Sequence, residues 1–323
     1  MTIAGSVAGQ TVADVGEFGL IDLVRTSADA PHVLIGPGDD AALVRASPTG
    51  MLASLDVAIE GRHFRRDWSS ASDVGHKVAA ANLADISAMG GTARSLLVGF
   101  SAPSDLPVAW VTEMTAGLVA EAATVGAVIV GGDVTAADSI VVAVSVLGDP
   151  GEHVVRRNGA QRGDVVAVAG RLGWAAAGFA VLTRGFRSPR AVVEAHRRPQ
   201  PPYAAGPQAA AAGAHAMVDV SDGLLADLGH VARSSGVRLD LRSDAVDLPE
   251  PLQAVGAALG VDPRGFVFTG GDDHALAACF APGSVPDGWL EIGLAHPVEQ
   301  GQPAAVTVDG EPWPGAPGHT SFG

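Results

Sequence analysis

The chain has 323 residues, of which 47% are hydrophobic and 17% are charged, and its formal net charge is −15. This length exceeds what one hydrophobic core usually fills, so we expect two globular domains of about 150 residues each. The negative charge argues against nucleic-acid and anionic-membrane partners, and the single cysteine, Cys279, excludes an intramolecular disulfide and a multi-thiolate metal site.

The first residues contain neither a basic segment nor a long apolar one, so we predict no secretory signal and expect a cytoplasmic location. No apolar run is long enough to cross a bilayer. A helix is predicted over residues 16–27, where apolar residues recur with helical period. Residues 32–46 are predicted as two strands broken at a Gly-Pro-Gly turn, and residues 51–61 as a third strand with Asp56 in its middle.

A long helix is predicted over residues 73–89, with Ser72 as its N-cap. It is apolar on most faces and should be buried against a sheet. A strand over residues 92–103 follows, and then a helix that Pro107 opens. Two more strands are predicted on either side of the sequence GGDVTAAD, at residues 131–138, which completes an α/β domain.

The best domain boundary is the Asp-Pro-Gly turn at residues 149–151, because it separates an apolar strand from a fresh series of elements. We therefore predict domains over residues 1–149 and 150–323. The second domain is predicted to contain a strand at 163–170, a helix at 172–185, a Pro-rich loop at 199–202, a strand at 215–220, a helix at 221–236, and a strand pair within 266–280.

Acidic residues recur at strand ends, in Gly-rich turns or on apolar elements. They occur at 38–40, 54–56, 82–85, 131–133, 219–223 and 270–273. Taken singly, most have an ordinary explanation, since Asp bonds its own backbone in turns and Ser221–Asp222 suits a helix N-cap, a position that also binds phosphate. Asp56 and Asp85 lie among residues that should be buried, where an unpaired carboxylate costs several kcal/mol.

If these carboxylates converge, two of them about 4 Å apart repel by roughly 4 kcal/mol, so bound cations would be required. An all-oxygen set without cysteine or paired histidine ligands favours Mg²⁺ that shares its shell with phosphates and water. No P-loop sequence is present, since Lys77, the only lysine, does not follow the Gly-rich run that such a loop requires. Phosphate binding would then depend on metal ions, arginines and backbone amides, which points to a nucleotide.

Eight motifs follow one another along nearly the whole chain. They are GEFGLI, GPGDDAAL, SLDVAIEGRHF, NLADISAMG, VGGDVT, VVRRNGAQRGD, MVDVSDGLLADLGH and FTGGDDHALAACF. Together they resemble the thiamine-monophosphate kinases, a family of the ATP-using superfamily that also contains aminoimidazole ribonucleotide synthetase and selenophosphate synthetase. The pairing of GEF with D-x-x-x-x-G-x-H-F, here Asp56 to Phe64, favours this family over its relatives. The resemblance implies a two-domain α/β (α+β) fold, dimerisation through the N-terminal sheet, and a site in the cleft between the halves.

The same resemblance implies the site residues. The implied metal ligands are Asp40, Ser54, Asp56, Asp85, Asp133, Asp219 and Asp222; the ATP contacts are Gly132, Asp133, Arg157 and Ser221; the substrate contacts are His63, Asp272, His319 and Phe322. Four positions depart from the family pattern. Leu55 replaces a hydroxyl residue, Asp272 replaces Glu, and His274 and His319 stand where larger aromatic residues are expected.

The implied activity is ATP-dependent phosphorylation of thiamine monophosphate to thiamine diphosphate, with several Mg²⁺ ions, by a homodimer whose other partners are small molecules. No general base is expected, because the acceptor phosphate is mostly a dianion at neutral pH. Three alternatives stay open: an enzyme of the same superfamily with another acceptor, a non-catalytic nucleotide- or metal-binding protein, and an acidic α/β interaction protein.

Overall fold

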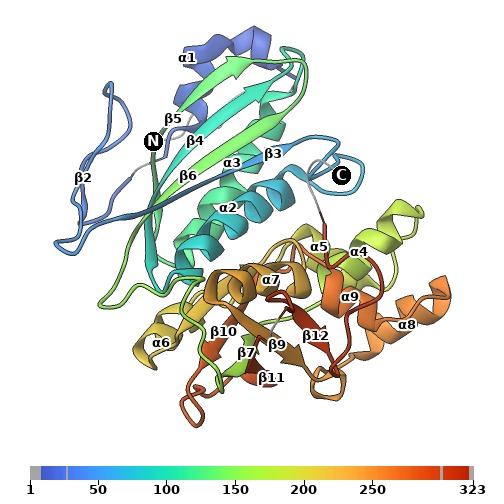
Figure 1. Cartoon of the computed structure of the whole chain (residues 1–323). Helices are drawn as coiled ribbons and strands as arrows, with labels where there is room; N and C mark the ends of the chain where they lie inside the picture. Colours follow the sequence, from blue (N-terminus) through green and yellow to red (C-terminus); the bar gives the residue numbers. More distant parts are fainter. Residues whose placement is uncertain (1–8, 27, 299–300, 320–323) are drawn as a thin grey trace. The chain divides into compact units, whose positions relative to one another are not determined.

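The computed structural model describes residues 9–26, 28–298 and 301–319. The chain divides into two compact units, Met1–Leu83 with Ala93–Asp149 and Ala84–Thr92 with Pro150–Gly323 (Figure 1). The second unit therefore begins after Asp149, where the sequence has its turn, and it also takes in the end of one helix. In the described part of the chain, no helix combines the length and the apolar character that a membrane crossing requires.

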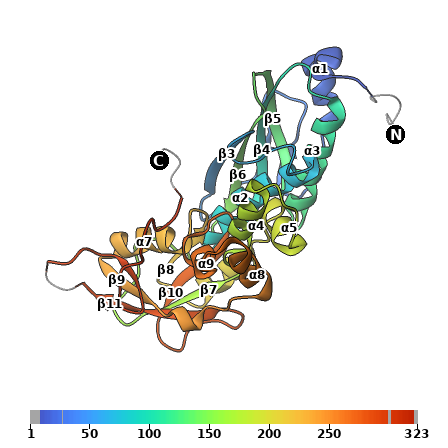
Figure 2. The ribbon, with the colours of Figure 1, turned by 90° about the vertical axis from the view of Figure 1, so that its right-hand side faces the viewer.

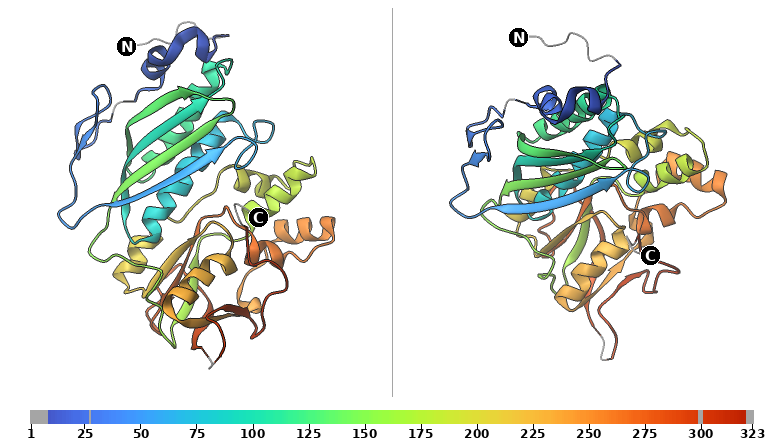
Figure 3. Two further views of the ribbon diagram at one scale, coloured as in Figure 1. Left: turned by 45° about the horizontal axis from the view of Figure 1, so that its top comes forward. Right: turned by 90° about the horizontal axis from the view of Figure 1, so that it is seen from above.

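The first unit is a four-stranded sheet covered by helices on one face. Its elements are α1 (Val12–Val24), β1 (Val33–Ile35), β2 (Leu43–Val44), β3 (Leu52–Ile59), α2 (Ala71–Ala88), β4 (Thr92–Ala102), α3 (Val108–Ala123), β5 (Val128–Ala136) and β6 (Val141–Asp149). The strand order is β3-β6-β4-β5, with β3 antiparallel to β6 and β4 parallel to β5. Helices α2 and α3 lie on one face of this sheet, and the short β1–β2 pair stands away from it (Figures 1 and 3).

Alternation along β6 shows which face of the first sheet is covered. Val142, Val144 and Val146 are fully buried, whereas the residues between them are only half-buried. Because β6 pairs with β3 in register, the residues of β3 opposite these valines also point to the helix-covered face. The opposite face carries exposed apolar side chains, including Leu55 and Leu97.

Two sequence expectations about the first unit are wrong. The cap of α2 is Ser70 and not Ser72: the hydroxyl of Ser70 accepts the Asp73 amide hydrogen, and the Asp73 carboxylate accepts that of Ser70. The GGD segment at residues 131–133 lies inside β5 and not in a turn. A Cβ atom at Gly132 would lie 2.1 Å from the carbonyl oxygen of Val98, so glycine serves here to let β5 approach β4.

Two glycines allow α2 and α3 to pack closely. A Cβ atom at Gly75 would lie 1.9 Å from the carbonyl oxygen of Met114, and one at Gly117 would lie 2.1 Å from that of Ser72. Both contacts are with backbone atoms, which cannot rotate away as the end of a side chain can. The helix pair can therefore keep its spacing only with glycine at these positions.

We expect Gly75→Ala to lower the free energy of unfolding by about 3 kcal/mol, because the added methyl group forces α2 and α3 apart. The matched control is Gly265→Ala, at a helical glycine with open space around its Cβ position. The control should be neutral or stabilising by up to about 1 kcal/mol, since alanine favours helix. Scanning calorimetry of both variants checks this, and an unchanged melting temperature for Gly75→Ala would contradict the packing.

The second unit is a six-stranded sheet between helices. Its further elements are β7 (Val165–Ala169), α4 (Trp174–Thr183), α5 (Arg190–Arg197), α6 (Ala205–Ala211), β8 (Ala216–Val220), α7 (Leu224–Ser235), β9 (Val237–Leu241), a 3₁₀ turn (Ser243–Ala245), α8 (Glu250–Leu259), α9 (Arg264–Thr269), β10 (Ala275–Phe280), β11 (Leu290–Pro297) and β12 (Val306–Val308). The strand order is β12-β9-β11-β7-β10-β8. Figure 2 shows α7 beside β8 and β9 of this sheet.

The strands β7, β8 and β10 are buried along their whole length, because both faces of the sheet are covered. One face carries a cluster that includes Ala88 at the end of α2, Met217 of β8 and Leu276 of β10. Asp219 pairs with Leu276 and alternates with Met217 in β8, so its side chain lies on this same face. The end of α2 and Asp219 thus meet on one side of the second sheet.

The second unit also corrects two expectations. Residues 266–269, predicted as strand, belong to helix α9, and only β10 forms the strand that follows. Helix α7 begins at Leu224, so Ser221 and Asp222 form a turn before the helix and do not cap it. The error at residues 266–269 arises because an apolar run of four residues is compatible with both a helix and a strand.

Candidate active site

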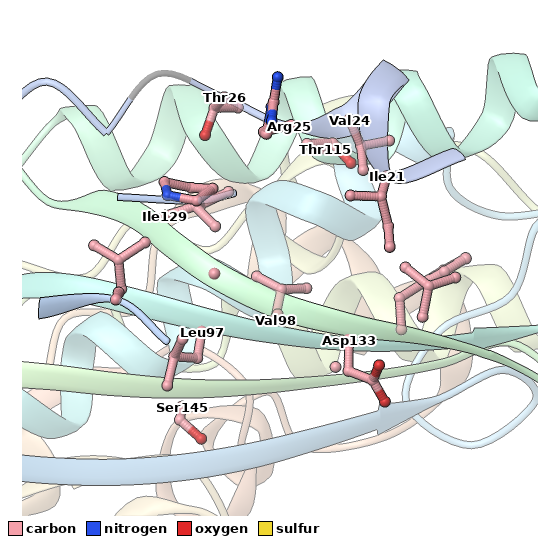
Figure 4. A pocket seen from close by; sticks show the side chains of 18 of the residues that line it. Ile21, Val24, Arg25, Thr26, Leu97, Val98, Thr115, Ile129, Asp133 and Ser145 are labelled. Carbon is pink, nitrogen blue, oxygen red and sulfur yellow. The ribbon is translucent and has the colours of Figure 1, made fainter. Parts of the chain in front are cut away.

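The first unit contains a cavity of about 1010 Å³. It is bordered by α1, the segment between β1 and β2, part of α3, and the open face of the sheet. Two predicted metal ligands, Asp40 and Asp133, and the predicted ATP contact Gly132 line it. Figure 4 shows the carboxylate of Asp133 among the lining side chains, with Ser145 on the neighbouring part of the sheet.

The other two predicted metal ligands of the first unit lie together on β3. Ser54 and Asp56 stand opposite Val146 and Val144, on the helix-covered face of the sheet. Leu55 lies between them, points to the open face and is 58% exposed. The family's hydroxyl at this position would therefore also point away from Asp56, and replacing it by leucine leaves the Ser54–Asp56 face unchanged.

The predicted substrate contact His63 lies in the turn after β3. Its Nδ1 atom accepts the amide hydrogen of Ile59 at 3.0 Å, and the amide of His63 donates back to the Ile59 carbonyl. Because Nδ1 is an acceptor here, the neutral ring carries its proton on Nε2. The exposed side chain can therefore donate a hydrogen bond to an anion such as a phosphate oxygen.

In the second unit, the turn after β8 and the segment before β10 are joined by backbone hydrogen bonds. The amide of Asp272 donates to the Ser221 carbonyl at 2.8 Å, and that of His274 donates to the Val220 carbonyl at 3.0 Å. A Cβ atom at Gly271 would lie 2.1 Å from the Ser221 carbonyl oxygen, so this approach requires glycine. The predicted metal, ATP and substrate residues of these two motifs are thus held side by side.

Three predicted acidic site residues act on one buried histidine, His274. Its Nδ1 atom lies 3.1 Å from Oδ2 of Asp219. Burial lowers the pKa of His274, but the hydrogen bond and charge of Asp219, followed by the charges of Asp272 and Asp85, raise it above its ordinary value. The structure therefore pairs His274 with Asp219, and the charges of Asp272 and Asp85 act on the same imidazole.

Both Asp272 and His274 have positive φ angles, 70° and 52°. Non-glycine residues rarely adopt this conformation, and such positions concentrate at functional sites. The sequence suggested that His274 occupies the place of an aromatic wall. In the structure its side chain is buried and its Nδ1 atom contacts Asp219.

The amides of the turn after β8 are already bound. Oδ2 of Asp227 accepts the amide hydrogens of Ser221, Asp222 and Gly223 at 3.1, 3.0 and 3.0 Å. Burial raises the pKa of Asp227 to about 7, the charge of Asp219 adds to this, and the amide hydrogen bonds oppose it. These amides therefore have Asp227 as their acceptor in this structure, and the hydroxyl group of Ser221 is the part of that residue that we propose for phosphate binding.

Asp273, next to the predicted substrate contact Asp272, has a different function in the fold. Its two oxygens accept the amide hydrogens of Gly173 and Ala175 at 2.6 and 2.8 Å, at the start of α4. Burial raises its pKa to about 7. Asp272 itself is 44% exposed, and its carboxylate lies 3.9 Å from Nδ1 of His196. Of this pair, Asp272 is thus the one placed to meet a ligand.

Arg157, the predicted ATP contact, lies in the second unit within electrostatic reach of His230 on α7. It is exposed, and its carbonyl accepts the Ser235 hydroxyl hydrogen at 3.2 Å. Burial lowers the pKa of His230 on α7, and the charges of Arg233 and Arg157 lower it further, while Asp222 raises it. These shifts show that the arginines and Asp222 lie within electrostatic reach of one side chain.

The C-terminal segment also reaches this turn. The amide of His319 donates to the Asp222 carbonyl at 2.9 Å, and a Cβ atom at Gly318 would lie 2.5 Å from the same oxygen. The predicted substrate contact His319 is thereby fixed next to a predicted metal ligand. Phe322, the other contact predicted in this tail, lies outside the described residues.

The residues fit magnesium that arrives with a nucleotide. Within residues 9–26, 28–298 and 301–319, no three Asp, Glu, His or Cys side chains are grouped closely enough to hold an ion by themselves. Mg²⁺ usually takes one or two protein carboxylates and completes its shell with phosphate oxygens and water. Exposed or half-buried oxygen ligands such as Asp40, Asp85 and Asp222 suit that arrangement.

Sequence reasoning missed Asp227, Asp273 and the pairing of His274 with Asp219. Asp227 had a usable signal, because an acidic residue in the first turn of a helix tends to bind free amides there. Asp273 had no such signal, since the sequence of two adjacent aspartates in a Gly-rich segment does not show which side chain is buried.

Residues 38–149 match the family model described as AIR synthase related protein, N-terminal domain, and residues 161–282 match its C-terminal domain. Thiamine-monophosphate kinase of Mycobacterium tuberculosis (strain CDC 1551 / Oshkosh) is 48% identical over 97% of this chain and 93% of its own length. Thiamine-monophosphate kinase of Stenotrophomonas maltophilia K279a has a TM-score of 0.79 and 30% identity, covering 96% of this chain and 98% of that one. A structure described as AaThiL complexed with AMPPCP and TMP has a TM-score of 0.78 and 30% identity, covering 96% and 99%.

Proposed function

Because this chain belongs to the thiamine-monophosphate kinases, within the AIR synthase related proteins, we propose that it transfers the terminal phosphoryl group of ATP to thiamine monophosphate. The products are thiamine diphosphate and ADP. The predicted family and two-domain α/β fold are confirmed. The structural observation that supports the proposal is the pairing of buried His274 with Asp219, beside the turn of Ser221 and Asp222 whose Ser221 carbonyl accepts the amide hydrogen of Asp272.

Seven residues are the proposed magnesium ligands. Ser54 and Asp56, on the helix-covered face of the first sheet, and Asp40 and Asp133, at the cavity on its open face, would hold separate ions. In the second unit, Asp85, Asp219 and Asp222 would hold magnesium that binds the ATP phosphates. When bound, Mg²⁺ neutralises phosphate charge and so favours attack by an anionic acceptor. Gly132, Arg157 and the Ser221 hydroxyl contact ATP in this proposal, and the guanidinium of Arg157 offers positive charge to the phosphates.

The chain binds and orients the acceptor without a general base. The second pKa of a phosphate monoester is about 6, so its oxygens are already ionised at neutral pH. His63 donates from Nε2 to the acceptor phosphate, and Asp272 and His319 bind the remainder of thiamine monophosphate, with Phe322 as a further contact. Because chemistry needs no proton transfer, catalysis depends on positioning and on charge.

The proposed active form is a homodimer joined through the open face of the first sheet. Leu55, Val57 and Leu97 are exposed there by 58%, 41% and 39%. The β1–β2 pair adds the exposed Leu34 and Leu43, at 53% and 51%. An apolar sheet face of this kind is a liability in water unless another surface covers it.

A product assay tests the proposed function. The protein is incubated with Mg·ATP and either thiamine monophosphate or free thiamine, and the thiamine products are separated by chromatography. We expect thiamine diphosphate and equimolar ADP from thiamine monophosphate, and no phosphorylation of free thiamine, which lacks the acceptor phosphate. ADP formation that is independent of thiamine monophosphate would favour a superfamily member with another acceptor, and no ADP at all would favour a non-catalytic protein.

A further inference from the structure

Asp227 lies in the first turn of α7 and is 4% exposed. Three consecutive amide hydrogens, from Ser221, Asp222 and Gly223, converge on its Oδ2 atom at 3.0–3.1 Å. The amide of Asp227 donates in turn to the Gly223 carbonyl at 2.9 Å. The carboxylate therefore joins the first turn of α7 to residues 221–223 and fixes the conformation of the turn after β8.

The carbonyl groups of the same turn are held by other segments. Asp272 donates to the Ser221 carbonyl, and His319 donates to the Asp222 carbonyl. Those contacts come from backbone amides, which almost any residue supplies. The amide side of the turn depends instead on one side chain, so a single substitution at residue 227 can release it while the carbonyl contacts remain.

The type of side chain also matters. An oxygen of the ionised carboxylate accepts several hydrogen bonds, and its charge strengthens each of them above the pKa of about 7. Asn would keep one acceptor oxygen of similar reach but lose the charge, and Ala would lose the acceptor. The carboxylate of Asp227 therefore holds the three turn amides more strongly than a neutral side chain of the same size would.

We propose that Asp227 is a positioning residue of the phosphoryl transfer, which holds Ser221 and Asp222 in the arrangement that binds Mg·ATP. The inference rests on the proposed function, where Ser221 and Asp222 receive those roles. Partners that orient metal ligands typically contribute about 10- to 100-fold in affinity or activity. An effect of this size should appear in the affinity for nucleotide and magnesium, and not in the KM for thiamine monophosphate.

The test compares Asp227→Ala, Asp227→Asn and Asp227→Glu in the full chain. The matched control is Asp164→Asn, another buried carboxylate of the second unit, which accepts the Gln161 amide hydrogen at 2.7 Å and pairs with His215. Calorimetric titration gives the Kd of a non-hydrolysable ATP analogue with Mg²⁺. Steady-state kinetics give kcat, the KM values for both substrates and the Mg²⁺ concentration for half-maximal rate, and thermal melting reports folding.

We expect Asp227→Ala to raise the Kd of the Mg·ATP analogue by about 10- to 100-fold, with a smaller rise for Asn. Glu, whose carboxylate is displaced by one methylene group, should fall between Ala and the wild type. The KM for thiamine monophosphate should stay within about twofold. Asp164→Asn should melt at a lower temperature with the Kd of the analogue unchanged, because the carboxylate it loses lies outside this turn.

Folded Asp227 variants that bind the analogue as the wild type does would overturn the inference. So would equal losses for both substrates that Asp164→Asn reproduces, since these would reflect general loosening. If the Ala variant does not fold, the Asn variant decides. A wild-type chain that binds Mg·ATP analogue but makes no thiamine diphosphate would sink the proposed function alone, because the Kd comparison still decides the role of Asp227.

Discussion

Asp222→Asn is expected to lower kcat by about 100-fold or more while the chain stays folded, because it removes a negative charge from the proposed magnesium site. Asp85→Asn should have a similar effect, since Asp85 is also a proposed magnesium ligand and its charge reaches His274 in the same unit. Both substitutions preserve side-chain size, so packing is little changed. The measurement is kcat at saturating Mg²⁺ and both substrates, with circular dichroism to confirm folding.

The control for these variants is Asp262→Asn, which removes a carboxylate of the second unit that is exposed and paired with Arg264 at 2.7 Å. Surface ion pairs of this kind contribute little to stability, so the kcat of Asp262→Asn should stay within about twofold of the wild type. Near-normal turnover in both Asp85→Asn and Asp222→Asn would remove these residues from the set of metal ligands.

Leu97→Asp is expected to convert a dimer into monomers, because it places a charge in the centre of the open face of the first sheet. Leu97 faces the same side as the cavity-lining Leu55 and Ser145. Burying an unpaired carboxylate there costs several kcal/mol, which weakens the association by several powers of ten. Light scattering should give twice the chain mass of 32.4 kDa for the wild type and the single mass for the variant.

Leu290→Asp is the matched control for this experiment. Leu290 is 45% exposed on a strand of the second unit, which makes it comparable in type and exposure to Leu97. The control should keep the wild-type mass. A wild-type chain of single mass, or a Leu97→Asp variant that stays dimeric, would contradict dimerisation through this face.

Most helices and strands could be predicted because their signals are local. The alternation along β3, the Pro-Gly break before β2 and the Pro at the start of α3 each specify an element without help from the rest of the fold. The errors arise where contacts with residues distant in sequence decide whether a segment forms a helix, a strand or a turn. The GGD segment becomes strand because β4 lies against Gly132, and residues 266–269 become helix although their apolar run fits both structures.

Part of the candidate site could be predicted because its motifs are also local sequence signals. The motifs identified Asp219, Asp222 and Asp272, which the structure places in adjoining segments. They could not show that Asp227 takes the amides of the turn, or that His274 compensates Asp219, because both depend on which side chain turns inward. Nor could they show that Ser54 and Asp56 lie on one face of the sheet while Asp133 borders a cavity on the other.

The central claim is that these carboxylates serve a nucleotide bound through magnesium. Its most direct test is calorimetric titration of the wild-type chain with a non-hydrolysable ATP analogue, once with Mg²⁺ and once with a chelator in its place. We predict saturable binding with Mg²⁺ and a loss of at least about 100-fold in affinity without it, since the acidic side chains then repel the phosphates. Equal binding in both titrations, or none in either, would contradict the account.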